Sequence, residues 1–352
     1  MATTRASSQP DDRGDYGAEH AALDRAYAAA QRERRDLEPE GRYIIFSDQH
    51  RGARNGADDF ESAEETYMAA LTWYFEHGYT LVVLGDAEEL WQETPAAVVE
   101  AYSACLALEA KFHGAGRYLR VWGNHDDDWE ERRAVRKHLQ PVYGGAPLVT
   151  FESLAFAVRE EGCDLGTLLL LHGHQGSFKS DRWSGVARWL VRHFYRPFQR
   201  LTGRSLDTPS KNPHLRQAQN KALYTWSEAQ ERVVLIAGHT HRPVFESRSS
   251  RSNLREQLAA AKTRLGRELD DKTLRVKVAE LEEEVEAAPE ANERPLKPCY
   301  FNTGCCCYHG GDITGIELFE GEIRLVHWPD EEGRMKPLVI ERDTLSRVFD
   351  NC

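Results

Sequence analysis

Seven residues of this chain carry side chains that divalent metal ions favour, and each lies just after a short apolar segment. They are Asp48, His50, Asp86, Asn124, His172, His239 and His241. Residues that only shape a turn are usually Asp, Asn, Ser or Gly and seldom His, so turn formation does not explain this set. Carboxylate oxygens combined with imidazole nitrogens suit Mn²⁺, Fe or Zn²⁺ without selecting one of them. The pattern therefore predicts a site for a pair of divalent metal ions.

The apolar segments before these residues are expected to form β-strands. They are Tyr43–Phe46, Thr80–Leu84, Tyr118–Trp122, Thr167–Leu171 and Val233–Ala237. Between them, Phe60–His77 and Pro95–Phe112 read as helices, the first ended by Gly78 and the second with proline in its first turn. Strands that alternate with helices predict α/β layers with a mostly parallel sheet. In such sheets ligands bind at the carboxyl ends of the strands, where the seven residues fall.

Five short motifs follow one another along the chain: SDQH, GD, GNHD, HGH and GHTHRP. In this order they resemble the motifs of the calcineurin-like metallophosphoesterases, over about Arg42 to Val244, with the strands after Pro298 resembling the rest of the core. The resemblance implies a four-layer α/β/β/α sandwich with helical insertions. It also implies a phosphodiesterase or phosphomonoesterase, or an enzyme with both activities, that uses a hydroxide bridging two metal ions.

The resemblance also implies a role for each ligand. Asp48, His50 and His241 would bind the first ion, Asp86 would bridge the two ions, and Asn124, His172 and His239 would complete the second site. Manganese is the first choice of metal, with iron or zinc as alternatives.

Two further motif residues are expected to be catalytic. His125 would lie beside the metals as the general acid for the leaving group, or else form a positioning hydrogen bond to phosphate. Asp126 is expected to orient His125.

Three residues that flank the motifs are candidates for substrate binding. The guanidinium groups of Arg51 and Arg242 could each hold a phosphate through two hydrogen bonds, although placement on the surface is an equally open interpretation. His174 would point to the same side of an extended strand end as His172. It is expected to face the substrate or to support a ligand.

The motifs GDAEELW, HGH and GHTHRPVF resemble in particular the UDP-2,3-diacylglucosamine hydrolase branch. Residues 179–230 form a basic, aromatic-rich insertion that could cap an apolar substrate, or could be an ordinary amphipathic helix packed on the core. That branch has GNRD where this chain has GNHD. A general phosphoester hydrolase is therefore the first prediction, and hydrolysis of lipid A precursors is the alternative. A metal-dependent nuclease and an inactive scaffold protein are further alternatives.

The predicted core comprises residues 41–251 and 294–352, with late strands at Tyr300–Asn302, Ile313–Leu318 and Glu322–His327, the last two forming a hairpin at Gly321. Residues 1–40 are expected to be a polar extension with a peripheral helix. Residues 252–293 have apolar residues at helical spacing with a break after Leu269, which predicts a charged helical arm folded as a hairpin. The arm could make the chain a homo-oligomer, or could pack as a flap on its own core.

Composition excludes several classes of protein. The chain has 352 residues and a net charge of −12, which argues against a surface that binds nucleic acid throughout, although a local basic patch remains open. Its apolar runs fall short of the ~20 residues of a membrane span, and no secretory signal is visible, so a cytoplasmic location is expected. Seven Cys occur without CxxC spacing, and Cys305, Cys306 and Cys307 are expected to be small buried thiols.

Overall fold

The computed structural model describes most of the chain. The described residues are 16–37, 41–55, 58–175, 213–245, 297–308, 310–330 and 336–352, with positions 258, 262, 265, 275, 278, 279, 281, 282, 285 and 286. The aromatic and basic residues expected to form a cap, at positions 179–212, lie outside the described residues. Position 213 begins a described helix.

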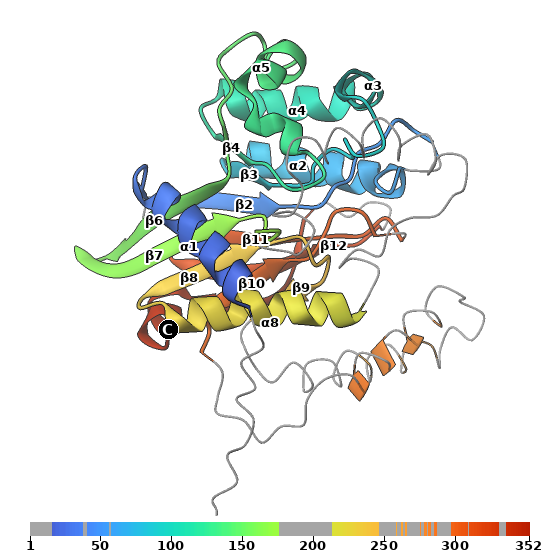
Figure 1. Ribbon diagram of the computed structural model, residues 1–352. Coiled ribbons are helices and arrows are strands. Elements are labelled where there is room, and N and C mark those ends of the chain that lie inside the picture. The colour runs from blue at the N-terminus through green and yellow to red at the C-terminus, as the bar shows by residue number, and fades with distance from the viewer. Residues whose placement is uncertain are drawn as a thin grey trace, which may run out of the picture.

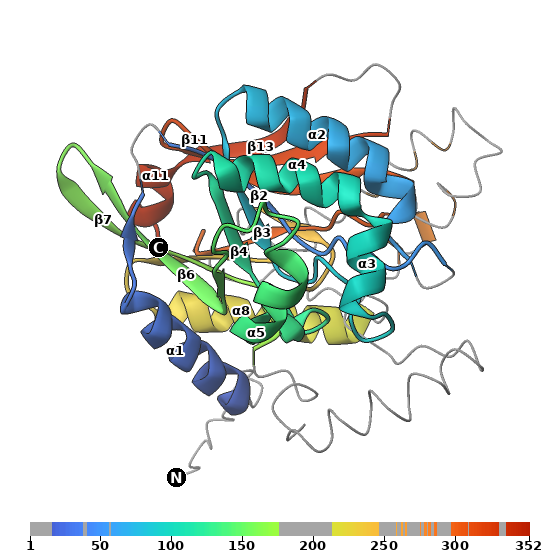
Figure 2. The same cartoon turned by 90° about the horizontal axis from the view of Figure 1, so that it is seen from above.

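Two stacked β-sheets form the centre of the molecule (Figures 1 and 2). The six-stranded sheet has the order β1-β6-β7-β8-β10-β9. Its strands are β1 (Arg35–Asp36), β6 (Ser153–Glu160), β7 (Cys163–Leu171), β8 (Val233–Ala237), β10 (Tyr300–Thr303) and β9 (Pro243–Val244). The seven-stranded sheet has the order β13-β12-β11-β2-β3-β4-β5. Its strands are β13 (Leu338–Thr344), β12 (Glu322–Trp328), β11 (Ile313–Phe319), β2 (Arg42–Phe46), β3 (Thr80–Leu84), β4 (Tyr118–Val121) and β5 (Thr150–Phe151).

Both sheets are mixed, so the expectation of a mostly parallel sheet is only half right. The strands that precede the candidate ligands are parallel neighbours: β2, β3 and β4 in one sheet, and β7 and β8 in the other. Each sheet also has antiparallel pairs. In the seven-stranded sheet β11, β12 and β13 form a meander, and in the six-stranded sheet β6 and β7 form a hairpin. The expected hairpin at Gly321 is confirmed, as β11 pairs with β12 around it.

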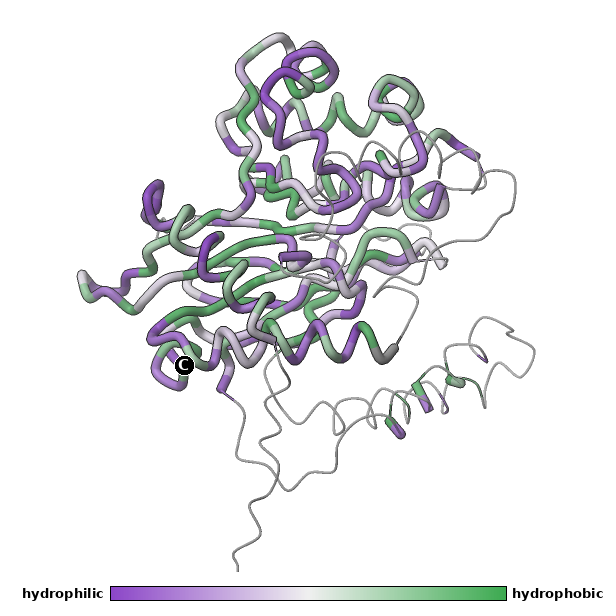
Figure 3. Tube along the Cα trace, in the orientation of Figure 1, coloured by the Kyte–Doolittle hydropathy of each residue, from purple (hydrophilic) through white to green (hydrophobic). Residues whose placement is uncertain are grey.

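Alternate side chains of each strand face different hydrophobic layers. Ile45 of β2 and Ile236 of β8 belong to the cluster between the two sheets, whereas Ile44 faces the helices over the seven-stranded sheet. Leu235 faces the helices on the other side. Hydrophobic residues are accordingly concentrated along the central strands in Figure 3. Burial on both faces explains why these strands read as continuous apolar runs rather than alternating ones.

Helices cover both outer faces and complete the expected α/β/β/α sandwich. The helices α2 (Glu64–Glu76), α3 (Pro95–Ala101) and α4 (Ser103–Gly114) lie over the seven-stranded sheet, and α1 (Gly17–Gln31) and α8 (Pro213–Ala229) lie over the other (Figure 2). Short helical segments are η1 (Glu61–Ala63), η2 (Asp127–Glu130), α5 (Arg132–Ala134) and η3 (Val135–Leu139), and α11 (Leu345–Asp350) is the last described helix.

The helix expected over Pro95–Phe112 is divided into α3 and α4 at Tyr102. The backbone of Tyr102 leaves the helical region, with φ −113° and ψ 30°. Its side chain is fully buried, its hydroxyl donates to Asp58 Oδ2 at 2.8 Å, and its ring packs against Phe60. Contacts with a distant loop therefore override a locally continuous helical pattern.

The N-terminal helix is not peripheral, which corrects the expectation for residues 1–40. In α1, Leu23 and Ala26 are fully buried against the six-stranded sheet. Strand β1 then pairs in parallel with β6. The described part of the N-terminal segment is thus an outer layer and an edge strand of the sandwich.

The described residues of 252–293 are helical and support the expected hairpin. Val278 and Leu281 are buried against Leu258 and Leu265 of the first helical segment. Lys262 Nζ lies 2.6 Å from Glu282 Oε1, which adds an ion pair between the two segments. The apolar stripe therefore has a partner within the same chain.

Among the helices that the structure describes, none combines the length and the apolar character needed to cross a lipid bilayer.

Candidate metal centre

The carboxyl ends of strands from both sheets meet at one edge of the sandwich. The loops after β2, β3 and β4 come from one sheet, and the loops after β7 and β8 come from the other. Within each sheet the strand pairing extends into the loops, since Asp48 N donates to Gly85 O at 3.1 Å and Gly238 N donates to His172 O at 2.9 Å. Across the sheets, His239 N donates to Asp48 Oδ2 at 2.9 Å. The fold thus brings all the expected ligand loops together.

One group of ligand atoms combines residues of the first and last motifs. His241 Nε2 lies 3.2 Å from Asp48 Oδ1 and 3.1 Å from His50 Nε2. His50 Nε2 lies 3.8 Å from Asp48 Oδ1. These atoms lie close enough to one another to hold one metal ion.

A second group, made of Asp86, His172 and His239, lies beside the first. His172 Nε2 lies 2.9 Å from Asp86 Oδ2, and His239 belongs to the same group. Asp86 Oδ2 is also 3.8 Å from His50 Nε2. Because Asp86 faces both groups, its carboxylate occupies the position that a bridging ligand requires.

Among the buried atoms that form no hydrogen bond of regular geometry with the described residues, four belong to expected metal ligands. They are Asp48 Oδ1, Asn124 Oδ1, His172 Nε2 and His239 Nε2. A buried polar atom without a partner costs about 1–3 kcal/mol, and such atoms are rare in native proteins. All four belong to expected ligands, and oxygen and imidazole donors suit divalent transition metals. The residues present therefore fit a pair of divalent cations.

The backbone at the ligands adopts a conformation that residues other than glycine seldom use. The φ angles are 54° at Asp48, 50° at His50, 52° at Asp86, 69° at His239 and 58° at His241. Left-handed backbone at a non-glycine residue costs about 1–3 kcal/mol and is concentrated at functional sites. The backbone is therefore strained at five ligands whose side chains converge on one site.

Two motif glycines leave room for the ligands. A Cβ atom at Gly85 would lie 2.6 Å from the imidazole ring of His172, and Gly85 itself has φ of 86°. A Cβ atom at Gly123 would lie 2.6 Å from the backbone nitrogen of Asp86. Close packing of one loop on the next therefore explains why glycine precedes Asp86 and Asn124 in the GD and GNHD motifs.

The electrostatic field of the centre favours positive charge. Burial opposes protonation of His172, but Asp86 and Asp48 outweigh it and raise its pKa to about 9. Burial likewise opposes protonation of His241, and Asp48 raises its pKa to about 9. Although burial alone would raise the pKa of Asp86, the surrounding imidazoles hold it well below its ordinary value. The buried carboxylates thus attract cations to this place, and a metal ion would satisfy that demand in place of protons.

His125 lies beside the two groups, but its partner differs from the expected one. Its Nδ1 lies 2.7 Å from Glu89 Oε2, and its ring stacks on Trp91 with centroids 4.1 Å apart. Asp126, which was expected to orient His125, instead accepts hydrogen bonds from the backbone N–H groups of Gly123, Asp86 and Ala87. Asp126 therefore holds the loops of the centre together, and the prediction that it orients the imidazole is wrong.

Glu89 was missed by the sequence analysis. It lies three residues after Asp86 in GDAEELW, and its Oε2 is also 3.4 Å from His50 Nδ1. The sequence did contain a signal for it, because the GDAEELW motif has further acidic residues shortly after Asp86.

The substrate-binding prediction for Arg51 is contradicted. Its side chain is fully buried, and the guanidinium lies 2.9 Å from Glu88 Oε1 and 2.7 Å from Glu109 Oε1. Arg120 pairs with Glu88 as well, and Tyr118 and Tyr143 donate to Glu109. All three guanidinium nitrogens of Arg51 donate to protein acceptors, Nε to Ala87 O and the other two to the carboxylates, and the side chain is closed to solvent, so it is not placed to hold a phosphate.

The other two flanking candidates lie near the centre. His174 is buried, with its ring 5.6 Å from that of His172 and 5.4 Å from that of Trp122. Burial, with a smaller effect of His172, lowers the pKa of His174 to about 3, so this imidazole is neutral. Arg242 is half-buried next to His241.

Comparisons with known proteins agree with this geometry. A model of the calcineurin-like phosphoesterase family matches residues 41–243, which is more than half of the chain. A search among curated proteins gave no match.

Two solved structures have low similarity to the chain. One is a dimetal phosphatase from Danio rerio, with 12% identity and a TM-score of 0.38, over 86% of this chain and 99% of that one. The other is Vacuolar Protein Sorting 29 from Cryptosporidium parvum, with 11% identity and a TM-score of 0.32, over 86% of this chain and 98% of that one. The family match alone carries the conclusion: the chain belongs to the calcineurin-like phosphoesterase family and is a metal-dependent phosphoester hydrolase.

Proposed function

We propose that the chain hydrolyses phosphodiesters, phosphomonoesters or both at the centre formed by the loops after β2, β3, β4, β7 and β8. The observation that carries this proposal is the convergence of buried ligand atoms that form no hydrogen bond of regular geometry with the described residues. Buried acceptors and imidazole nitrogens of this kind are costly unless a cation satisfies them.

The chain's own residues divide into two ligand sets in this proposal. Asp48, His50 and His241 hold one ion, and Asn124, His172 and His239 hold the other. Asp86 is shared between the two sets. Divalent cations bound in such a pair neutralise charge on the phosphoryl group and supply a nucleophilic water near neutral pH. Manganese is the proposed metal on the family resemblance, since this mixed donor set suits Mn²⁺, Fe and Zn²⁺ alike.

His125 is the proposed general acid. Glu89 accepts the hydrogen bond from Nδ1, which fixes the tautomer and leaves Nε2 to hold the proton for the departing oxygen. The imidazole is 13% exposed, so a leaving group can reach it, while stacking on Trp91 fixes the plane of the ring. Glu89 thereby acts on the reaction through the orientation and charge of His125.

A panel of substrates tests the proposed function. The protein, saturated with Mn²⁺, is assayed with an aryl phosphodiester, an aryl phosphomonoester, a cyclic nucleotide and a nucleotide-linked glycolipid. We expect hydrolysis of at least one of the first three to depend on metal, with loss after chelation and recovery when Mn²⁺ is restored. Turnover of the glycolipid alone would favour the lipid A precursor alternative that the motifs around HGH and GHTHRPVF leave open. Turnover that survives chelation would contradict the proposal.

The 252–293 arm is proposed to be dispensable for hydrolysis. Its described apolar side chains pack on one another, so the arm needs no core contact to bury them. Replacing residues 252–293 with a short Gly/Ser linker is therefore expected to leave the core folded, because the free energy of closing a loop changes little with its length. We expect kcat for an aryl phosphodiester to stay within about twofold. Light scattering on the same two proteins checks self-association, which stays a prediction. Loss of turnover in a folded, metal-loaded deletion variant would contradict dispensability.

A further inference from the structure

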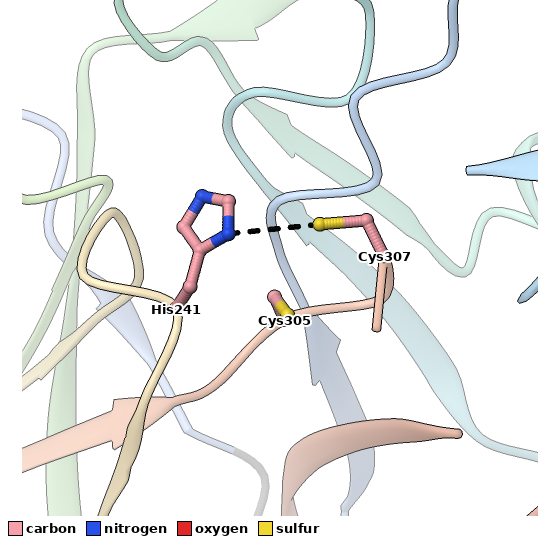
Figure 4. A group of neighbouring side chains, drawn as sticks. All are labelled: His241, Cys305 and Cys307. Carbon is pink, nitrogen blue, oxygen red and sulfur yellow. Dashed lines mark hydrogen bonds between the residues drawn. The ribbon is translucent and has the colours of Figure 1, made fainter. Parts of the chain in front are cut away.

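The run Cys305-Cys306-Cys307 lies in the loop after β10, next to the metal centre, and the proposed function gives it no role. All three thiols are free and buried. Cys306 faces the hydrophobic core with Sγ 3.9 Å from Thr314 O, whereas Cys305 and Cys307 face His241 (Figure 4).

The two outer thiols and one imidazole nitrogen form a compact donor group. Cys307 Sγ lies 3.6 Å from His241 Nδ1, and one ring nitrogen of His241 and the sulfurs of Cys305 and Cys307 all lie within 4.8 Å of one another. A tetrahedral Zn²⁺ with bonds of about 2.3 Å to sulfur and about 2.0 Å to nitrogen separates those two donor atoms by about 3.6 Å. The observed spacing therefore matches that of two ligands on one ion.

The protein holds this group in place from several sides. Tyr308 donates from its hydroxyl to His241 O at 3.1 Å, which ties the cysteine loop to the loop after β8. Cys306 N donates to Asp48 O at 3.2 Å, and Thr314 N donates to Cys305 O at 3.1 Å. His241 is 18% exposed, so an ion can enter from the solvent. A donor set fixed before binding loses little entropy when an ion arrives.

We propose that Cys305 Sγ, Cys307 Sγ and His241 Nδ1 form a third metal position that takes a thiophilic d¹⁰ cation such as Zn²⁺. His241 would serve both positions, with Nε2 at the main centre and Nδ1 here, and the two sulfur donors would make this position select soft ions. Each thiol would lose its proton to solvent when the ion binds, and so would the His241 ring, because an imidazole that already holds an ion through Nε2 can bind another through Nδ1 only as an imidazolate. The three protein donors leave a fourth coordination position for water or another small ligand.

Cadmium titration tests the proposal, because Cd²⁺–thiolate bonds absorb in the ultraviolet and Cd²⁺ bound to oxygen and nitrogen does not. The full chain is first saturated with Mn²⁺ and then titrated with CdCl₂. We expect a thiolate band that saturates at about one Cd²⁺ per chain, as one two-sulfur position requires. This readout does not depend on hydrolysis, so the proposal and the proposed function fail independently.

Cysteine variants show which thiols bind the cadmium ion that gives the band. The band is expected to vanish in the double variant Cys305→Ser, Cys307→Ser and to fall to about half in either single variant, since each removes one of two sulfur ligands. Cys163→Ser and Cys306→Ala are the controls and should keep the full band, because Cys163 is exposed on β7 and Cys306 points into the core. If the double variant fails to fold, the single variants still decide the question.

Three results would overturn the proposal. One is a band of full intensity in the single or double variants, which would place cadmium on other thiols. Another is no thiolate band at all in the reduced chain. The third is resistance of Cys305 and Cys307 to alkylation until a reductant is added, which would show a disulfide where the ion is expected.

Discussion

Replacing Asp86 with alanine is expected to lower kcat/KM for an aryl phosphoester by about 10³-fold or more. Asp86 is the carboxylate that approaches both ligand groups, with Oδ2 2.9 Å from His172 Nε2 and 3.8 Å from His50 Nε2, and it is the proposed bridging ligand. Metal ions contribute several kcal/mol to stabilising charge in such reactions, and each 1.36 kcal/mol corresponds to a factor of ten in rate. Loss of the shared ligand should therefore remove most of the activity.

Metal content is the second readout of the Asp86→Ala variant. Elemental analysis should find close to two metal ions per chain in the unchanged protein. The variant should hold fewer, because it lacks the proposed bridging carboxylate. Asp36→Ala is the matched control, since Asp36 is an exposed carboxylate on β1 that pairs with Arg159. Circular dichroism checks that both variants fold. An Asp86→Ala variant with unchanged metal content and unchanged turnover would refute the bridging role.

The second large effect is expected from His125→Ala, and it should depend on the leaving group. General acid catalysis contributes about 10²–10⁴-fold when the leaving oxygen must be protonated. An alkyl phosphoester has such a leaving group, whereas p-nitrophenolate departs without a proton. We therefore expect a loss of about 10²-fold or more with the alkyl ester and a much smaller loss with the p-nitrophenyl ester.

Two measurements separate the acid role from simple phosphate positioning. Metal content should be unchanged in His125→Ala, because the ring lies beside the ligand groups and is held by Glu89 and Trp91. An equal loss with both esters would leave only the positioning hydrogen bond.

Glu89→Gln is the companion variant to His125→Ala. Since Glu89 acts through His125, the variant should show the same dependence on the leaving group with a smaller loss. Saturating Mn²⁺ is used because Glu89 also lies 3.4 Å from His50.

The position of the metal centre was predictable from the sequence because it depends on local features. Strand β8 matches the predicted segment Val233–Ala237 residue for residue, and β4 differs from its prediction by one residue. Each is a short apolar run followed by a polar loop, and both signals lie within about ten residues. Ligands that follow parallel strands meet at one sheet edge, so the order of the motifs was enough to group Asp86 with Asp48 in one sheet and His172 with His239 in the other, while stacking of the sheets joined the two groups.

The partners of individual side chains were not predictable in the same way. Arg51 comes directly after His50, yet its guanidinium turns away from the ligands to Glu109, which lies 58 positions later in the chain. His125 has Asp126 as its neighbour in sequence, but the carboxylate that reaches its ring is that of Glu89. In both cases the packing of one loop on another decides which carboxylate is within hydrogen-bond reach.

By itself, the sequence determined the order of strands and loops and placed candidate ligands at the ends of strands, because these follow from local periodicity, whereas the four-layer fold and the role of each ligand came from the resemblance of its motifs to a known family. Only the tertiary structure decided the left-handed backbone at five ligands, the burial of Arg51, the pairing of β1 with β6 and the approach of Cys307 to His241. These features depend on contacts between segments far apart in the chain. Such contacts form when the two sheets stack, and no local pattern of residues records them.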